Sequence, residues 1–368
     1  MHLYLHIPYC AAKCPYCDFN SIAGRDGEHA AYVDALLAEV RRLPTGPYAT
    51  VFIGGGTPTA LDHRELARCL AGIRDHIRLA PEAEWTCEAN PGSADAEKFR
   101  ILAEHGVNRL SLGVQSTDDA TLSWLGRVHD GAAAERAVAA ACAAVPRVSA
   151  DLMFGLPGQD AAAVARDLDL YRRHGLRHAS VYHLAYEPGT EFHARRSRGE
   201  LAEIPSEDSR RLWSAVADGL AALGLEPYET SNFAAPGQES QHNLAYWRGR
   251  DYQAAGAGAV STVDGVRLTR EKHPAQYIAA ITAGGDAVWR REALTAQDHL
   301  AEAWMLGLRL AEGVDPARLA DLGDDPARWR PLAVPLIDLG LLVERDGRLA
   351  LTPAGRLVQD EVTARLMP

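Results

Sequence analysis

The stretch LYLHIPYCAAKCPYCDFNS, residues 3–21, places Cys10, Cys14 and Cys17 directly after a short apolar run. These three residues are half of the six cysteines in the chain. The C-x₃-C-x₂-C spacing suits ligands that wrap one compact object. A cubane [4Fe–4S] cluster bound by three thiolates keeps its fourth iron free for another ligand. We therefore predict an iron–sulfur cluster with one open iron, next to the first strand of the fold.

A disulfide and a structural zinc site are the alternatives for these cysteines. Structural zinc normally takes four ligands as two separated pairs, and His6 is a candidate for the fourth. The other cysteines, Cys69, Cys87 and Cys142, fall in a helical, a strand-like and a helical run. We expect these three to behave as small buried hydrophobic residues.

Composition helps to decide between a metal site and a disulfide at the clustered cysteines. The chain has 368 residues, 47% hydrophobic and 24% charged, with a formal net charge of −11, which argues against a nucleic-acid-binding surface. The sequence has no apolar run long enough to span a membrane and no signal peptide, so we expect a cytoplasmic protein, with peripheral membrane contact left open. In the cytoplasm, clustered cysteines favour metal binding over a disulfide.

Strand-like and amphipathic helical runs alternate through the first 205 residues. The predicted strands are 3–7, 50–54, 85–89, 109–113, 148–154 and 178–184. Helical periodicity between them occurs in HAAYVDALLAEVRRL, RELARCLAGIRDHI, ADAEKFRILAEHG, GAAAERAVAAACAAV and AVARDLDLYRRHG. Six such units with right-handed crossovers predict an α/β fold, a partial (β/α)₆ barrel. A seventh and an eighth unit are lacking, which argues against a complete eightfold barrel.

The pattern changes after residue 205. We predict a barrel over 1–205, a connecting segment over 206–294 and a smaller α+β domain over 295–368. This last domain is winged-helix-like, with two helices and a strand pair turning at Asp346-Gly347. Its 12 Asp and Glu residues against 8 Arg and no Lys argue against DNA binding. We expect it to pack against the barrel.

Polar or glycine-rich groups end the predicted strands. They are GGGTPT (54–59), Glu88, Gln115 and Asp151. Parallel barrels perform their chemistry at the carboxyl ends of several strands. The glycine run matches neither a phosphate loop nor a dinucleotide fingerprint, but glycines allow a close backbone approach. These groups predict a polar ligand at the mouth of the barrel.

Taken together, LYLHIPYC, GGGTPT, GVQS, LGRVH, DLMFGLPGQ and YHLAYEPGT resemble the radical S-adenosylmethionine (SAM) superfamily. The similar branch contains oxygen-independent coproporphyrinogen III oxidases and the HemW haem chaperones. The resemblance covers nearly the whole chain, including LTPAGRLV (351–358). It implies that the amino and carboxylate groups of SAM bind the open iron, and that an electron from the cluster cleaves SAM to a 5′-deoxyadenosyl radical.

The resemblance also implies the residues of the site. Cys10, Cys14 and Cys17 are the implied metal ligands. Positions that match cofactor-binding positions of the family are Tyr4, Tyr16, Gly55, Gly56, Thr57, Glu88, Gln115, Arg127, Asp151 and Ala185. In these roles the Gly-Gly-Thr turn and Glu88 would satisfy the SAM ammonium, Arg127 would pair with its carboxylate, and Asp151 would accept from the ribose hydroxyls.

Two departures separate the chain from the oxidases. Phe19 stands where the oxidases have a further cysteine, and the oxidases' extension before the first strand is almost missing. HNLAYW (242–247) matches a motif associated with haem in the chaperones. It places His242 near Tyr246 and Trp247, and histidine is a common axial ligand of haem iron. The alternative is that His242 caps a helix or lies in the core.

We therefore expect a haem chaperone that binds a [4Fe–4S] cluster, SAM and haem. The resemblance implies haem-accepting partners such as respiratory enzymes, and an electron donor such as flavodoxin or ferredoxin. One alternative is a radical enzyme acting on a tetrapyrrole, either a coproporphyrinogen III dehydrogenase or a haem-degrading methyltransferase. Another is a zinc-stabilised binding module. SAM cleavage is left open, and coproporphyrinogen III oxidase activity is expected to be absent.

Overall fold

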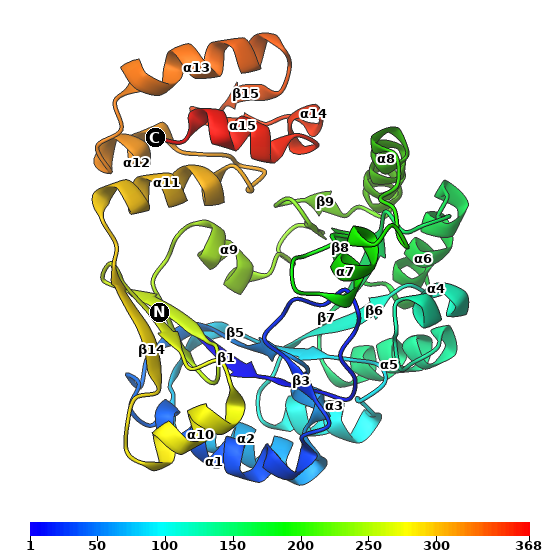
Figure 1. Ribbon diagram of the computed structural model, residues 1–368, viewed down its shortest axis with the longest axis vertical. Coiled ribbons are helices and arrows are strands. Elements are labelled where there is room, and N and C mark those ends of the chain that lie inside the picture. Colours follow the sequence, from blue (N-terminus) through cyan, green and yellow to red (C-terminus); the bar gives the residue numbers. More distant parts are fainter.

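The computed structural model describes residues 1–368 and contains a twelve-stranded sheet with helices on its outer side (Figure 1). Six neighbouring strands are parallel and follow one another in chain order. They are β1 (His2–Ile7), β4 (Tyr48–Gly55), β5 (Leu79–Ala89), β6 (Arg109–Gln115), β7 (Arg147–Phe154) and β8 (His178–His183). The predicted partial barrel of six β/α units is confirmed.

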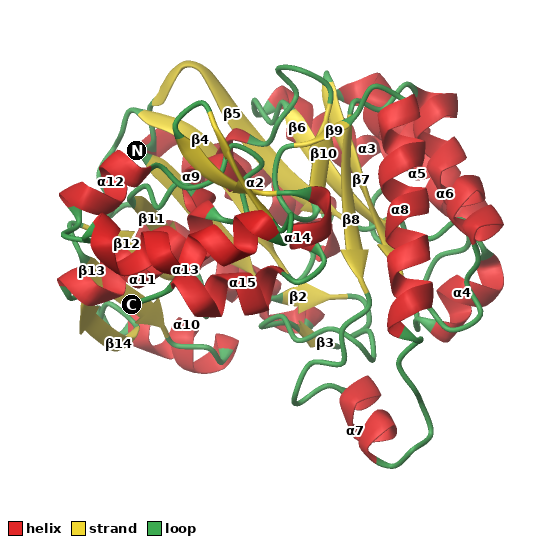
Figure 2. Cartoon of the chain, turned by 90° about the horizontal axis from the view of Figure 1, so that it is seen from above, coloured by secondary structure: helices red, strands yellow, loops and turns green.

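Helices connect these parallel strands. They are α1 (His29–Val40), α2 (His63–His76), α3 (Ala96–Glu104), α4 (Asp119–Trp124), α5 (Gly131–Ala144) and α6 (Ala161–His174). Five of the six begin after an aspartate whose side chain accepts a hydrogen bond from a backbone N–H of the first turn, which stabilises the helix start. α5, α6 and α8 (Ser206–Ala222) lie along the outer side of β7 and β8 (Figure 2). The helices and strands bury one large apolar core between them.

Strands from the connecting segment extend the sheet at both edges, which the sequence did not predict. β11 (Tyr252–Ala255) pairs in parallel with β1, and β12 (Val260–Val263), β13 (Val266–Arg270) and β14 (Val288–Ala293) continue as antiparallel strands. At the other edge, β10 (Asn232–Ala234) pairs antiparallel with β8 and with β9 (Glu226–Pro227). The short helices of this segment are α9 (Gln241–Trp247) and α10 (Pro274–Thr282), and a further short helix, α7 (Glu191–Ser197), follows β8.

The C-terminal residues form a separate apolar core around Trp304 and Trp329. Its elements are α11 (Ala296–Gly307), α12 (Pro316–Asp321), α13 (Pro326–Asp338), β15 (Leu342–Arg345), β16 (Arg348–Leu351), α14 (Pro353–Arg356) and α15 (Gln359–Leu366). The hairpin turns at Asp346 and Gly347, both with positive φ, as the sequence predicts. Three helices precede it, where two were expected.

This domain contacts the connecting segment, for example through the ion pair between Arg248 and Glu312 at 3.0 Å. Its contacts are therefore to the connecting segment, whereas the sequence led us to expect packing against the barrel. None of the helices combines the length and the apolar character that crossing a bilayer requires.

Candidate functional site

A cavity of about 320 Å³ lies at the carboxyl ends of the parallel strands. It brings together most of the residues that the sequence singles out. Those that line it are Cys10, Cys14, Tyr16, Cys17, Gly56, Thr57, Glu88, Gln115, Arg127, Asp151 and Ala185. The cavity walls do not include Tyr4, Gly55 or His242.

The loop that carries the cysteines is fixed at several points. Within it, β2 (Tyr9–Cys10) pairs with β3 (Ile22–Ala23). His6 lies beneath the loop, where its Nε2 contacts the Asn20 carbonyl oxygen at 2.8 Å and its Nδ1 contacts the Tyr4 hydroxyl at 2.9 Å. Both ring nitrogens are engaged, so His6 supports the loop and is not available as a fourth metal ligand.

The three cysteines predicted to bind the iron–sulfur cluster lie along one cavity. All three are free and partly buried along one cavity. No group of three His, Cys, Asp or Glu side chains in the chain is arranged to hold one metal ion. Burial raises the pKa of the Cys10 and Cys17 thiols, while Arg127 Nη1 lies 3.3 Å from Cys14 Sγ. Coordination to iron keeps such sulfurs ionised, and the guanidinium adds a compensating positive charge.

Arg127 also tightens the wall of the cavity. Its Nη2 donates to the Gly113 carbonyl at 2.7 Å, and its Nη1 lies 3.4 Å from the Tyr16 hydroxyl. Gln115 ends β6 nearby with a left-handed φ of 70°, next to an irregularity in the pairing with β7. A non-glycine residue in this conformation is strained, and such strain clusters at ligand sites.

Two carboxyl groups face the same cavity from β5 and β7. Glu88 Oε2 accepts from the Gly55 amide at 3.1 Å, and Asp151 accepts from the Ser111 hydroxyl at 3.0 Å. Burial, followed by the charge of Asp151, raises the pKa of Glu88 to about 8, and burial raises the pKa of Asp151 to about 6. A cationic ligand would favour the ionised form of both groups.

Glu88 should therefore make the stability of the ligand-free protein depend on pH. The folded state keeps a proton on Glu88 up to about pH 8, whereas the unfolded state loses it near the ordinary value of 4.5. Stability is lost as pH rises through this window, because the folded state holds the extra proton. Glu88→Gln removes that dependence, so its stability advantage over the parent in urea should be larger at pH 8.5 than at pH 5.

The matched control for this measurement is Glu97→Gln, at an exposed glutamate of α3. It should not gain stability relative to the parent between pH 5 and pH 8.5. A constant difference between Glu88→Gln and the parent at all pH values would contradict the raised pKa.

The glycine run after β4 is explained by close packing within the protein. A Cβ at Gly54 would stand 2.8 Å from Glu88 Oε2, and one at Gly55 would stand 2.5 Å from the His6 ring. A Cβ at Gly56 would stand 2.7 Å from the backbone of the cysteine loop. The run thus lets the cysteine loop and Glu88 approach the end of β4.

His242 lies apart from the cavity. It belongs to α9, is 1% exposed, and stacks against Phe52 of β4. Its Nδ1 bonds to Thr50 Oγ1 at 2.7 Å, and its buried Nε2 has no partner. Burial lowers the pKa of His242 to about 3. His242 thus lies in the core, which is the alternative that its sequence context left open, and its role as a haem ligand stays a prediction.

Buried Glu84 of β5 holds α9 in place. One of its oxygens accepts from the His242 amide at 3.0 Å and from the Ser240 hydroxyl at 3.4 Å. The other accepts from the Gln241 amide and from Arg147 Nη1, both at 3.0 Å. This carboxylate therefore joins β5, β7 and the start of the HNLAYW helix.

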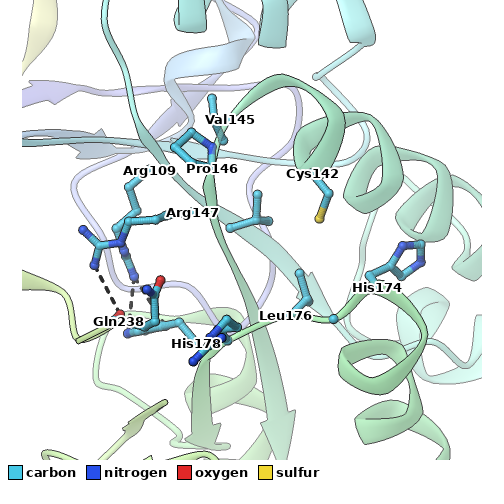
Figure 3. Close-up of a pocket in the computed structure, with 12 residues that line it drawn as sticks. Arg109, Cys142, Val145, Pro146, Arg147, His174, Leu176, His178 and Gln238 are labelled. Carbon is cyan, nitrogen blue, oxygen red and sulfur yellow. Dashed lines mark hydrogen bonds between the residues drawn. The ribbon is translucent and has the colours of Figure 1, made fainter. Parts of the chain in front are cut away.

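A smaller cavity of about 200 Å³ lies at the amino ends of β6–β8 (Figure 3). Arg147 donates there to the Gln238 carbonyl at 3.2 Å, while buried Arg109 contacts the His178 ring at 3.3 Å.

Cys142 also lines this cavity and is exposed, so its prediction as a buried residue is wrong. Cys69 and Cys87 are buried, as predicted.

Further residues line the large cavity without having been identified from the sequence. They are mainly Asn90, Ser111, Met153, Tyr182 and His183. Most of them lie within or directly after β5–β8, on the inward side of the alternating strand pattern. That alternation could have identified them once the strands were known.

Two protein-family models and a solved structure match this chain. Residues 4–171 match the Radical SAM superfamily, and residues 294–358 match the HemN C-terminal domain. The structure resembles that of "Coproporphyrinogen III oxidase (HemN) from Escherichia coli", with a TM-score of 0.85 and 24% identity over 99% of this chain and 89% of that one. At this identity the likeness shows the fold.

Several relatives are more similar in sequence, and each is named "Heme chaperone HemW". The Mycobacterium tuberculosis protein is 36% identical over 99% of this chain and 94% of its own length. The Bacillus subtilis protein is 34% identical over 98% of this chain and 97% of its own length. The Escherichia coli K12 protein is 41% identical over 76% of this chain and 75% of its own length. The chain therefore belongs to the HemW family of haem chaperones, within the radical SAM superfamily.

Proposed function

We propose that this protein is a haem chaperone that carries a [4Fe–4S] cluster and SAM, binds haem, and delivers it to acceptor proteins. The observation that carries this proposal is the match of almost the whole chain to proteins named haem chaperones. The cavity supports it, because three free thiols and most of the predicted SAM-binding groups line one space.

Cys10, Cys14 and Cys17 would hold the cluster. Three thiolates on a four-iron cluster leave one iron for SAM, to which the cluster can supply an electron when both are bound. The loop that presents these cysteines is already fixed by β2, β3 and the His6–Asn20 contact.

The SAM-binding roles follow from the charges around the cavity. Glu88, held by the Gly55 amide, would accept from the methionyl ammonium, and Asp151 would accept from the ribose hydroxyls. Arg127 lies beside Cys14 and would pair with the SAM carboxylate. Tyr4 lies outside the cavity wall and would act indirectly, through its bond to His6.

The competing function is decarboxylation of coproporphyrinogen III. Phe19 is the argument against it, since this exposed side chain stands at the edge of the cavity where the oxidases have a further cysteine. We expect no protoporphyrinogen after anaerobic incubation of the cluster-loaded protein with reductant, SAM and coproporphyrinogen III. Product detected by chromatography above a control without SAM would contradict the chaperone proposal in favour of the oxidase.

The partners follow from this role. The acceptors would be haem-dependent respiratory enzymes, and a low-potential protein such as flavodoxin or ferredoxin would reduce the cluster. We place this exchange in the cytoplasm, with acceptors reached at the membrane surface.

A further inference from the structure

A second large cavity, of about 580 Å³, lies between the connecting segment and the C-terminal domain. Its walls come from α9, from β11–β13 and from α11, and Figure 1 shows α9 between the sheet and α11. We call it the interdomain cleft. Its volume lies in the range of small-molecule sites. Its aromatic and apolar lining residues are Tyr182, Tyr246, Trp247, Tyr252, Met305 and Leu306.

The acidic residues of the interdomain cleft already have partners. Glu302 pairs with Arg267 at 2.7 Å. Asp251 accepts from a backbone amide at 3.1 Å, and Glu229 accepts from another at 2.9 Å. The second oxygen of Glu229, Oε2, is buried without a hydrogen-bond partner, and burial raises the pKa of this carboxyl group.

Two arginines of the cleft, in contrast, have no carboxylate partner at ion-pair distance. Arg250 is exposed at the end of the turn after α9. The Arg309 guanidinium lies over the Trp247 ring, 4.5 Å from its centre, and its buried Nε has no hydrogen-bond partner. The buried Trp247 Nε1 is also unpaired. Unpaired donors beside aromatic faces suit a flat apolar ligand that carries anionic groups.

Haem has this chemistry, with an apolar macrocycle and two propionates. It also needs a ligand to iron, and His299 of α11 lines the cleft with both ring nitrogens free of hydrogen bonds. His242 is fully enclosed between Thr50 and Phe52 and does not line the cleft. An accessible imidazole reaches iron without rearrangement of α9.

The cleft also adjoins the cluster cavity. Tyr182, at the end of β8, lines both spaces and is 42% exposed. A ligand in the cleft would therefore lie on the far side of Tyr182 from the residues assigned to SAM.

We infer that the interdomain cleft is the haem site, with Arg250 and Arg309 pairing with the propionates and His299 ligating the iron. This inference rests on the proposed function and locates the ligand of that function. In this site the HNLAYW helix forms one wall of the cleft, to which Tyr246 and Trp247 contribute.

Absorption titrations with haem and with haem dimethyl ester test the propionate contacts. Arg250→Ala and Arg309→Ala should each weaken haem binding about tenfold or more, because each removes a charge-assisted contact. Neither should change the affinity for the dimethyl ester, which lacks the two charges. Arg291→Ala, at an exposed arginine of β14 outside the cleft, is the matched control and should bind both ligands like the parent. An equal loss of affinity for haem and for its dimethyl ester, or no loss of affinity for haem, would overturn the assignment.

The iron ligand is tested by the position of the haem absorption band. His299→Ala should shift this band, and added imidazole should restore it, whereas His273→Ala, at an exposed histidine, should leave it unchanged. Iron and sulfide content checks that each variant keeps its fold and cluster. A band that moves in His242→Ala but not in His299→Ala would overturn the cleft as the haem site. A parent protein that binds no haem would instead overturn the proposed function itself.

Discussion

Cys14→Ser is expected to reduce the cluster content of the protein from one per chain to essentially none. Cys14 lies between the other two thiols in sequence and beside Arg127, and a three-thiolate cluster has no spare protein ligand. The same loss is expected for Cys10→Ser and Cys17→Ser. Anaerobic reconstitution followed by iron and acid-labile sulfide analysis measures the effect.

Cys142→Ser is the control for this experiment. Cys142 is a free cysteine on α5, at the amino-end cavity and away from the three ligands. The Cys142→Ser variant should keep full iron and sulfide content. Full content in Cys14→Ser, or zinc in place of iron in the parent, would exclude the cluster assignment.

Glu84→Ala is expected to destabilise the protein by about 3–5 kcal/mol, because it removes the ion pair to half-buried Arg147 and leaves two amides of the α9 start unpaired. Urea unfolding measures the loss. Hydrogen exchange should show faster exchange of the amides of Gln241 and His242, since both donate to this carboxylate.

Glu97→Ala, at an exposed ion pair of α3, is the control and should unfold at nearly the same urea concentration as the parent. If Glu84→Ala unfolds at the same urea concentration as the parent, the carboxylate does not hold α9 as described. Unchanged exchange at Gln241 and His242 would lead to the same conclusion.

The parallel part of the fold was predictable because its signals are local. Each of the six strands is a short apolar run, followed by a helix with clear periodicity and often an aspartate cap. The edge strands were missed for the opposite reason. β9–β11 contain two to four residues each, and β11 pairs with β1 from about 250 residues away. Pairing of this kind depends on tertiary contacts that no local pattern encodes.

The candidate site was predictable to the extent that strand ends converge. Glu88, Gln115 and Asp151 line one cavity because parallel strands bring their carboxyl ends to the same side. The environment of a single side chain was harder to predict. His242 is enclosed because α9 folds onto β4, and Cys142 is exposed because it lies on the outer face of an alanine-rich helix that gives little indication of orientation.

Haem transfer tests the proposed function directly. The cluster-loaded protein is titrated anaerobically with haem, separated from free haem, and mixed with a haem-free respiratory cytochrome whose spectrum and activity are followed. We predict about one haem bound per chain, and its transfer to the cytochrome with recovery of activity. A protein that binds no haem, or that keeps it while the cytochrome stays inactive, would contradict the proposal that this chain acts as a haem chaperone.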